Sequence, residues 1–557
     1  MRRDLTELTR NVYDLLIIGG GIYGACVAWD ASLRGLSVAL VEKSDFGSAT
    51  SANSLKIIHG GLRYLQHADF RRMRESIRER TTLMRIAPHL VHPLPVLIPT
   101  YGHGMRGKEV LSVALVVNDL VSFDRNRLDD PQKHIPRGRT ISRRECLQLL
   151  PGIPEQGLTG GAIFYDAQVY NSERFTLSFL RPAAKAGAHL ANYVEVTGFL
   201  QEGDRVTGVE AKDLLTGDRF DIRAKMVLNI CGPWVNHVLG LLNGRRPQPG
   251  VRCAKAINLM TRRLFHTYAV GVLGQNGYRD ADAVISKGSR FLFITPWRGQ
   301  SLIGTAYTVY NEDPDDFKVT EKDVQNLLNE INQACPSASL KREEISFVHG
   351  GLVPMSETDR ETGYVQLAKH YQIHDHRNEG VKGLLSVVGV KYTTARHVAE
   401  RVIDLVFEMR GQKPPRSTSS ITPLHGGQIE RFETFLHTEI GKRPYGLDEE
   451  AIRRLIYNYG SAYPEVLRYL DRDVHGGQKR TDRLAVLEAE ILHGVHEEMA
   501  QKLTDVVFCR TELGTAGHPG DDILRFCAEV MGTELGWSEA RIRRELQEVN
   551  EVFALGG

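Results

Sequence analysis

The stretch DLLIIGGGIYGACVAWDASLRGLSVALVE, residues 14–42, decides the fold of this chain. It opens on a short apolar run at 14–18, passes through three spaced glycines, and continues with small and apolar residues at helical spacing. A second apolar run at 37–41 ends at Glu42. A buried strand, a glycine turn, a helix and a second strand in this order are typical of a dinucleotide-binding βαβ unit.

Each of the three glycines in this unit has a physical task. Gly19 permits the tight turn from strand to helix, Gly21 lets the backbone approach a pyrophosphate, and Gly24 lets the helix pack closely on the strand. The phosphates would lie at the helix N-terminus, where free N–H groups and the helix dipole favour anions. Glu42, about 20 residues beyond the glycines, is placed to accept hydrogen bonds from an adenosine ribose. Glycine turns that serve only packing are the alternative, and the complete unit favours the dinucleotide site.

Composition and charge exclude several other classes of protein. The chain has 557 residues, a formal net charge of +2, 42% hydrophobic and 25% charged residues, as expected for a globular protein of several domains. The balanced charge argues against nucleic-acid binding, and no low-complexity tract indicates disorder. The apolar run at 110–121 is interrupted by Ser112, Asn118 and Asp119, so we expect no transmembrane span. The N-terminal MRRDLTELTR lacks the apolar segment of a signal peptide.

The cysteines and histidines show no ligand spacing. The chain has 7 cysteines and none of them forms a C-x-x-C pair, a pattern that fits a reduced, intracellular protein. The 20 histidines include no H-E-x-x-H motif. We therefore predict no structural zinc and no other metal site.

The residues after Glu42 make the prediction more specific. Small hydroxylated side chains in KSDFGSATSANS (43–54) suit a loop that wraps a pyrophosphate and a ribityl chain. With this loop before it, KIIHGGLRYL (56–65) resembles the FAD-dependent glycerol-3-phosphate dehydrogenase/oxidase family. Further elements similar to that family are GVEAKDLLTGDRFDIRAKMVLNICGPWVN (208–236), LLSVVGVKYTTAR (384–396) and the helical stretches 455–467 and 486–514.

The resemblance implies an α/β fold, with a Rossmann-like FAD-binding domain, an inserted mixed β-sheet substrate domain and an α-helical C-terminal domain. The pattern agrees, since RFLFITPWRGQSLIGT (290–305) predicts an antiparallel hairpin, KPPRSTSSITPLHGG (413–427) predicts a linker, and 73–90 predicts a helix. We expect the FAD-binding domain to span 1–415 discontinuously (about 12–100, 160–250 and 350–412), the substrate domain to fill about 101–159 and 251–349, and the helical domain to cover 428–557.

The resemblance also implies which residues contact the cofactor, FAD. They lie in the glycine turn, in the loop after the second strand, near the GPWV signature, or in the GVKYTT element. They are Gly19, Gly21, Gly24, Glu42, Lys43, Ser48, Thr50, Ser51, Lys56, Val194, Gly232, Trp234, Gly389, Lys391, Tyr392 and Thr393.

Oxidising a secondary alcohol on a flavin requires a base for the hydroxyl proton, and histidine is the side chain that exchanges protons near neutral pH. His59 is the candidate, because the resemblance places its segment beside the flavin; the alternative is that it only holds its loop. Lys391 is the second candidate, since a cation there would stabilise reduced flavin or attract a phosphate, whereas the alternative is a solvated surface lysine. Arg63 and Lys56 either help to bind an anion or are ordinary surface charges.

Three positions depart from the family's pattern, all in segments that resemble its substrate side. Val353 replaces an arginine that binds the substrate phosphate, Asn258 replaces a histidine, and Tyr307 replaces a carboxylate. The first change removes a bidentate contact to an anion. The predicted catalytic set is His59, Lys391, Arg63, Asn258 and Tyr307.

The sequence therefore predicts FAD-dependent oxidation of glycerol-3-phosphate to dihydroxyacetone phosphate, or of a related polyol phosphate, with electrons passed to a quinone or another acceptor such as oxygen. One alternative, which Val353 suggests, is a flavoenzyme of the same fold that oxidises a non-phosphorylated alcohol or an amine. Another is an FAD-binding scaffold or redox sensor without catalysis. The run at 110–121 lies either on a membrane surface, which favours quinone, or in a buried core helix. We expect a cytoplasmic protein; association with the inner face of the membrane and a homodimer are left open.

Overall fold

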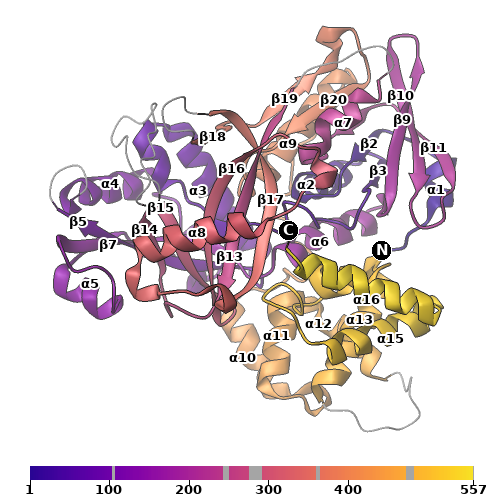
Figure 1. Ribbon diagram of the computed structural model, residues 1–557. Coiled ribbons are helices and arrows are strands. Elements are labelled where there is room, and N and C mark those ends of the chain that lie inside the picture. The colour runs from indigo at the N-terminus through magenta and orange to yellow at the C-terminus, as the bar shows by residue number, and fades with distance from the viewer. Residues whose placement is uncertain (103–106, 243–249, 275–290, 359–363, 472–481, 556–557) are drawn as a thin grey trace.

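The computed structural model describes residues 1–102, 107–242, 250–274, 291–358, 364–471 and 482–555, without the side chains of Arg63, Gln66 and Asp482. Over these residues the chain forms three β-sheets and a separate group of C-terminal helices (Figure 1). The C-terminal helices lie below the sheets in the view of Figure 1, and the long loop-rich end that carries α4 and α5 lies to the left.

A six-stranded sheet stands at the centre of the first part of the chain. Its strands are parallel except for β19 at the edge. β2 (Leu15–Ile18) is buried along its whole length, which is why its sequence is continuously apolar. The predicted unit is confirmed, since β2 is followed by α2 (Ile22–Leu33) and β3 (Val38–Val41). The order is β19 (Gln372–Asp375), β20 (Leu384–Val388), β12 (Val227–Asn229), β2, β3 and β8 (His189–Ala191).

The two faces of this sheet are covered differently. The helices α2, α6 (Ser172–Lys185) and α9 (Ala395–Met409) share an apolar core with one face. The other face packs on a four-stranded sheet, so that β2 and β3 are buried from both sides. That second layer consists of β1 (Val12–Tyr13), β11 (Arg219–Ala224), β10 (Arg205–Asp213) and β9 (Val194–Glu202), with α1 (Leu5–Arg10) and α7 (Val235–Gly240) beside it.

The third sheet has ten strands and is almost entirely antiparallel. The hairpin predicted at 290–305 is confirmed as β15 (Phe291–Trp297) and β16 (Gln300–Tyr310). α8 (Glu321–Ala334) and α5 (Arg143–Leu149) cover an apolar part of this sheet. The order is β18 (Val365–Leu367), β17 (Ile345–Thr358), β13 (Arg252–Thr261), β16, β15, β14 (Ala269–Leu273), β5 (Val91–Tyr101), β7 (Leu158–Val169) and β4 (Ile57–Ile58), with β6 (Arg139–Ser142) paired to β7.

Several strands of the third sheet come from segments that the sequence pattern assigned to the FAD-binding domain. β5, most of β7 and all of β18 fall within the ranges 12–100, 160–250 and 350–412, yet they pair with β14, β4 and β17 instead of joining the parallel sheet. The reason is physical: strand pairing is set by hydrogen bonds between distant segments, which no local pattern encodes. The division into domains stays a prediction, with these strands lying in the sheet of the predicted substrate domain.

Two helices, α3 (Phe70–Ile86) and α4 (Lys108–Val121), lie beside the third sheet. α3 begins at the N-cap Asp69, so the helix predicted over 73–90 forms three residues earlier and ends sooner. Within α4 only Leu115 is buried. The side chains of Val113, Val116, Leu120 and Phe123 are 65%, 58%, 70% and 71% exposed. Of the two alternatives for this run, the buried core helix does not match the structure, because α4 presents an apolar stripe to the outside.

The C-terminal helices follow a segment of turns that matches the predicted linker at 413–427. Two apolar clusters hold these helices together. No helix in the described part of the chain is long and apolar enough to cross a membrane. The helices are α10 (Phe432–Lys442), α11 (Glu449–Tyr459), α12 (Tyr463–Leu467), α13 (Asp482–Glu498), α14 (Leu503–Asp505), α15 (Asp521–Leu535) and α16 (Glu539–Phe553).

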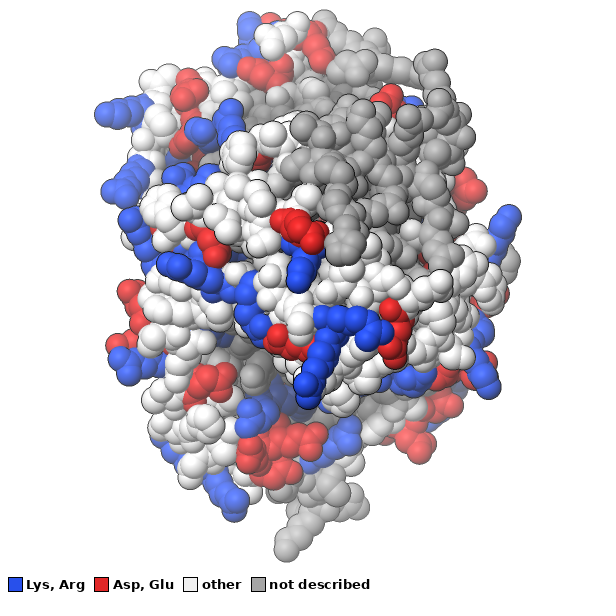
Figure 2. All heavy atoms as spheres, turned by 90° about the vertical axis from the view of Figure 1, so that its left-hand side faces the viewer, with Lys and Arg blue, Asp and Glu red and all other residues white. Residues whose placement is uncertain are grey.

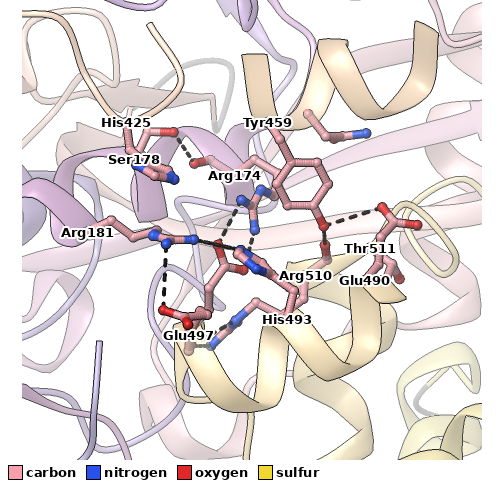
Figure 3. A network of polar contacts seen from close by, with 12 residues as sticks. Arg174, Ser178, Arg181, His425, Tyr459, Glu490, His493, Glu497, Arg510 and Thr511 are labelled. Carbon is pink, nitrogen blue, oxygen red and sulfur yellow. Dashed lines mark hydrogen bonds and ion pairs between the residues drawn. The ribbon is translucent and has the colours of Figure 1, made fainter. Parts of the chain in front are cut away.

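A buried ionic network joins these helices to the parallel sheet. Figure 3 shows Arg174 and Arg181 of α6 pointing at residues of the C-terminal helices. Both arginines bind the fully buried Glu498, at 2.5 Å and 3.0 Å. Next to them, Arg510 forms a buried bidentate pair with Asp45, at 2.5 and 2.8 Å. Because Asp45 lies in the loop that follows β3, the C-terminal helices help to hold the predicted cofactor loop.

Candidate active site

A single large cavity, about 2430 Å³ in volume, gathers the predicted site residues. Residues of the parallel sheet, the ten-stranded sheet and the C-terminal helices line it. Gly24 lies beneath this cavity instead of lining it, and the side chain of Arg63 lies outside the described part of the structure. All other predicted catalytic and cofactor-binding residues line the cavity.

The glycine turn forms the floor of one end of the cavity. Gly19 has φ +111°, a conformation that side-chain-bearing residues rarely adopt. A Cβ on Gly24 would lie 1.9 Å from the carbonyl oxygen of Gly19, so only glycine allows α2 to begin this close to β2. α2 has no side-chain cap at Gly21, and the Ile22 N–H donates to Ser51 Oγ at 3.0 Å. Ser51 thus occupies the N–H of the first helical residue, and an anion in the cavity would use the other N–H groups of the first turn.

Glu42 holds the glycine turn in place. One carboxylate oxygen accepts a hydrogen bond from the Gly20 N–H at 2.7 Å, and the other accepts from the Ser44 N–H at 2.9 Å. Burial raises the pKa of Glu42, while these two N–H groups act in the opposite direction. The sequence predicted a ribose contact for Glu42; in the structure it faces the cavity and also orders the turn.

The loop after β3 is hydrogen-bonded to the ten-stranded sheet through β17 and to the four-stranded sheet through β9. Ser48 Oγ donates to the Asp45 carbonyl oxygen at 2.8 Å, and Thr50 Oγ1 donates to the Leu352 carbonyl oxygen in β17, also at 2.8 Å. The N–H of Val194, at the start of β9, donates to the Glu42 carbonyl oxygen at 2.8 Å. These bonds give the cavity a rigid wall between the glycine turn and the ten-stranded sheet.

A polar contact crosses the cavity near this loop. Lys43 Nζ lies 2.5 Å from Asp315 Oδ1 and 5.4 Å from the centre of the Trp234 ring. Trp234, which follows Gly232 in the GPW turn, donates its ring N–H to the same carboxylate at 2.6 Å. His237 and Asp313 lie close to Asp315, with possible ligand atoms within 4.8 Å of one another. The side chains of His237, Asp313 and Asp315 are all exposed. The absence of a metal site stays a prediction.

The segment after β20 closes the cavity from the opposite side. Tyr23 of α2 donates its hydroxyl to the Lys391 carbonyl oxygen at 2.7 Å and accepts from the Lys391 N–H at 3.1 Å. Gly389 leaves room for the Tyr23 ring, since a Cβ there would lie 2.4 Å from it. Tyr392 donates its hydroxyl to the Ser172 carbonyl oxygen at 3.0 Å, while Thr393 is buried. The backbone around Lys391 is therefore fixed, and its side chain enters the cavity.

Lys56 lines the cavity, but its ammonium is bound by the protein. Nζ donates to Ser172 Oγ at 2.6 Å and to the Ala52 carbonyl oxygen at 2.5 Å, and it forms an ion pair with Glu173 at 3.0 Å. Burial lowers the pKa of Lys56, and the carboxylate of Glu173 opposes this shift. The structure thus gives Lys56 a part in holding the loop, and its predicted contact with FAD stays a prediction.

His59 is paired with a carboxylate that the sequence did not reveal. Its Nδ1 lies 3.3 Å from Oδ2 of Asp166 in β7, and its side chain is 48% exposed toward the cavity. The other oxygen of Asp166 accepts from the Gly60 N–H at 2.5 Å and from Arg80 at 3.2 Å. Burial raises the pKa of Asp166, but His59, Arg80 and Gly60 together lower it below its usual value. Asp166 therefore stays ionised and orients the imidazole.

The remaining candidates lie on the ten-stranded sheet. Asn258 is buried in β13, where its Oδ1 accepts from Thr305 Oγ1 at 2.8 Å. Tyr307 packs with Val353 and Leu367 on the cavity wall. The positions that depart from the family's pattern are thus adjacent on one surface, and this part of the wall is apolar or neutral.

Sequence reasoning missed Asp166, Arg80 and Tyr64. Asp166 lies 107 residues from His59, and no motif marks it. Tyr64 stands in the quoted KIIHGGLRYL segment, and its ring is 3.9 Å from Lys391 Nζ. The signal that could have found Tyr64 is its position five residues after the candidate base, whereas Asp166 becomes visible only when β4 pairs with β7.

The cavity has the features that a bound FAD requires. The first turn of α2 and the Glu42 carboxylate lie at one end, where a pyrophosphate and a ribose need an N–H donor and an acceptor. Apolar side chains and the Lys391 ammonium lie toward the other end, which suits a flavin ring. We conclude that the donor set fits the cofactor.

Comparison with known proteins agrees with this arrangement. A glycerol-3-phosphate dehydrogenase of Synechocystis sp. is 33% identical over 559 residues, covering 99% of this chain and 98% of its own. An aerobic glycerol-3-phosphate dehydrogenase of Staphylococcus haemolyticus is 30% identical over 515 residues, covering 91% and 87%. The crystal structure of the glycerol-3-phosphate dehydrogenase from Bacillus halodurans complexed with FAD matches with a TM-score of 0.75 and 26% identity, covering 98% of this chain and 95% of that one.

Two family models divide the chain between them. The model of FAD dependent oxidoreductases matches residues 14–404, and the model of the C-terminal domain of alpha-glycerophosphate oxidase matches residues 417–542. The first match includes the glycine turn, His59, Asp166 and Lys391. The chain therefore belongs to the family of FAD-dependent oxidoreductases, and its last helices form the C-terminal domain known from alpha-glycerophosphate oxidase.

Proposed function

We propose that this enzyme oxidises the secondary alcohol of glycerol-3-phosphate to dihydroxyacetone phosphate. The observation that carries the proposal is the His59–Asp166 pair, which stands in the same cavity as the residues that fit FAD. The names of the most similar relatives support this substrate. Bound FAD would supply the acceptor for the hydride that leaves the carbon.

The residues of the chain supply the proton chemistry and the charge. With Nδ1–H donated to Asp166, the Nε2 lone pair of His59 is free to accept the hydroxyl proton of the substrate. The carboxylate of Asp166 then stabilises the imidazolium, as an orienting carboxylate does beside a catalytic histidine. Lys391 places a positive charge in the same cavity. Its charge favours both a reduced flavin and an anionic substrate.

Anaerobic reduction of the bound flavin tests the proposal directly. We expect glycerol-3-phosphate at millimolar concentration to bleach the visible absorbance of the purified holoenzyme, with one dihydroxyacetone phosphate formed for each flavin reduced. Glycerol at the same concentration is the matched control, because it lacks only the phosphate. Bleaching by glycerol or by amines, but not by glycerol-3-phosphate, would contradict the proposal and favour the non-phosphorylated alternative.

We further propose that the electrons leave to a quinone at a membrane surface that α4 contacts. The exposed side chains Val113, Val116 and Leu120 are spaced along one face of α4, and Phe123 follows them. Figure 2, which looks at the end of the molecule that carries α4, shows uncharged surface bordered by Lys and Arg side chains and also by Asp and Glu side chains. The guanidinium of Arg74 lies 4.9 Å from the Phe123 ring. An apolar stripe with basic neighbours is typical of a helix that lies on an anionic membrane.

The cavity extends toward this helix. Leu111, Ala114 and Val117 of α4 line it, as do Phe291 and Phe293 of β15. The His59 ring lies 6.3 Å from the Phe293 ring, so the apolar part of the cavity adjoins the proposed base. A quinone, which is apolar and resides in the bilayer, fits an apolar path of this kind better than a water-soluble acceptor does. A homodimer stays a prediction.

Substitution of the α4 stripe tests the membrane contact. We expect the double variant Leu120→Glu, Phe123→Glu to lower binding to anionic phospholipid vesicles at least tenfold, because burial of each side chain contributes about 1.5–3 kcal/mol. Flavin reduction by glycerol-3-phosphate should not change, since neither side chain lines the cavity. Ile421→Glu is the control, because Ile421 is 63% exposed in the linker segment. Equal vesicle binding by the wild type and the double variant would contradict the proposed surface.

A further inference from the structure

The cavity needs a group that binds the phosphate, and the side chain of Val353 does not provide one. Val353 faces Ala254 across the β13–β17 pairing and, like Tyr307 and Leu367, packs against the apolar cluster that contains Ala254. The net charge of +2 supplies no strong positive field over the whole molecule. A phosphate dianion in this cavity must therefore be bound by a few local cations.

Arg72 is the only arginine among the described side chains that line the cavity. It lies in the first turn of α3, and its side chain is 12% exposed. Its guanidinium carbon is 4.6 Å from the centre of the Tyr64 ring, so the plane is positioned by an aromatic contact. Within the described part of the chain its guanidinium forms an ion pair with Asp69 at 3.4 Å, which is long for such a contact. A guanidinium held in this way keeps N–H groups for a bidentate contact with a phosphate.

Lys391 meets Arg72 at the same ring. Its Nζ is 3.9 Å from the centre of the Tyr64 ring, and the side chain lines the cavity. The two cations are thus gathered around one aromatic side chain, where they repel each other. A bound dianion would relieve this repulsion and would gain a contact with each cation.

The cation pair lies close to the strand that carries Val353. The Ala368 N–H donates to the Pro354 carbonyl oxygen at 3.0 Å, so the segment after β18 adjoins the residue that follows Val353. His370 comes two residues later. Burial lowers the pKa of His370, and the charges of Arg72 and Lys391 lower it further, whereas Asp69 and Glu75 oppose the shift. Arg72 and Lys391 thus both lie near His370, two residues beyond the segment that adjoins Pro354, together with the carboxylates of Asp69 and Glu75.

We propose that Arg72, together with Lys391, binds the phosphate of the substrate in place of the arginine that Val353 replaces. The inference rests on the proposed function, because it assigns a residue to the phosphate of that substrate. It also makes the chain specific for a phosphate monoester, since an uncharged polyol offers the guanidinium and the ammonium no anionic partner.

Affinity measurements on Arg72 variants test the assignment. We expect Arg72→Leu to raise the glycerol-3-phosphate concentration for half-maximal flavin reduction about 10- to 100-fold, the loss typical of a charged hydrogen-bond pair. The limiting reduction rate at saturation should stay within about threefold, because the proton transfer belongs to His59. The half-maximal glycerol-3-phosphate concentration of Arg72→Lys should lie between those of the wild type and Arg72→Leu. Arg71→Leu is the matched control, since Arg71 is the exposed neighbour in the same helix.

A rescue and a binding experiment complete the test. Val353→Arg in the Arg72→Leu background should recover most of the lost affinity, because it supplies a guanidinium on the adjacent strand. Inorganic phosphate should perturb the flavin absorbance of the wild type and should lose this effect in Arg72→Leu at unchanged FAD content. Unchanged affinity for glycerol-3-phosphate in Arg72→Leu would overturn the assignment. If the wild type is not reduced by glycerol-3-phosphate, the proposed function fails, while a phosphate effect that depends on Arg72 would still support the anion site.

Discussion

His59→Asn is expected to keep its FAD and to lose between about 10² and 10⁴ of its turnover, the usual contribution of a positioned base. The FAD should stay because His59 contacts neither the glycine turn nor Glu42. Asparagine has no lone pair that accepts a proton at neutral pH, so the alcohol would have to lose its proton to water. Steady-state turnover with glycerol-3-phosphate and the flavin content of the purified variant measure the two expectations.

His374→Asn is the control for this experiment. His374 lies in β19, hydrogen-bonds Gln372 at 2.9 Å, and does not line the cavity. The His374→Asn variant should oxidise glycerol-3-phosphate at the wild-type rate. Turnover within twofold of the wild type in His59→Asn would reduce His59 to a residue that holds its loop, which is the alternative reading of the sequence. Loss of FAD together with activity would point to the same structural role.

Glu498→Gln is expected to destabilise the holoenzyme by about 3–5 kcal/mol, the cost of leaving a buried charge without its partner. Glu498 is fully buried and neutralises Arg174 at 2.5 Å and Arg181 at 3.0 Å. An amide replaces the carboxylate that pairs with the buried Arg174 by a neutral acceptor, whereas Arg181 keeps its ion pair with Glu465 at 2.8 Å. The urea midpoint of unfolding, followed by circular dichroism at neutral pH, measures the change.

Glu497→Gln is a control one residue away. Its carboxylate is 37% exposed and lies 4.0 Å from Arg181, so its removal should cost no more than about 1 kcal/mol. Equal destabilisation by the two variants would show that the network does not depend on the buried carboxylate.

The pH dependence of these variants has a defined sign. Burial raises the pKa of Glu498, but Arg174, His493 and Arg181 together bring it well below 4.5. A carboxyl with a lowered folded-state pKa stabilises the protein above its unfolded value and loses that contribution as the pH falls. The gap in stability between wild type and Glu498→Gln should therefore be constant near neutral pH and should shrink below about pH 4.5.

The sequence predicted the parts of the fold that local patterns encode. The strand at 14–18, the glycine turn, α2 and β3 follow from apolar runs and glycine spacing, and the β15–β16 hairpin follows from alternation around a turn. It could not predict that β5 and β7 join the ten-stranded sheet, since their pairing depends on distant partners. The exposed stripe on α4 was also left open, because the apolar residues of a surface helix and of a core helix look alike in sequence.

In the candidate site, too, local sequence patterns identify some residues and miss those that depend on tertiary contacts. His59 and Lys391 stand in recognisable motifs, and both line the cavity. Asp166 and Arg72 stand in none, and each acquires its place only through a tertiary contact, with His59 in one case and Tyr64 in the other. The ion pair of Lys56 could not be predicted either, because the sequence position near His59 does not reveal the buried carboxylate of Glu173.

The pair between Asp45 and Arg510 has a consequence for how the protein is made. Asp45 belongs to the loop after β3, and its partner lies 465 residues later in the chain. Translation proceeds from the N-terminus, so the nascent chain exposes the glycine turn long before Arg510 leaves the ribosome. Until then the loop lacks the guanidinium that compensates its buried carboxylate. We therefore expect stable incorporation of the cofactor to follow release of the finished polypeptide, and chains that terminate early to leave translation as apoprotein.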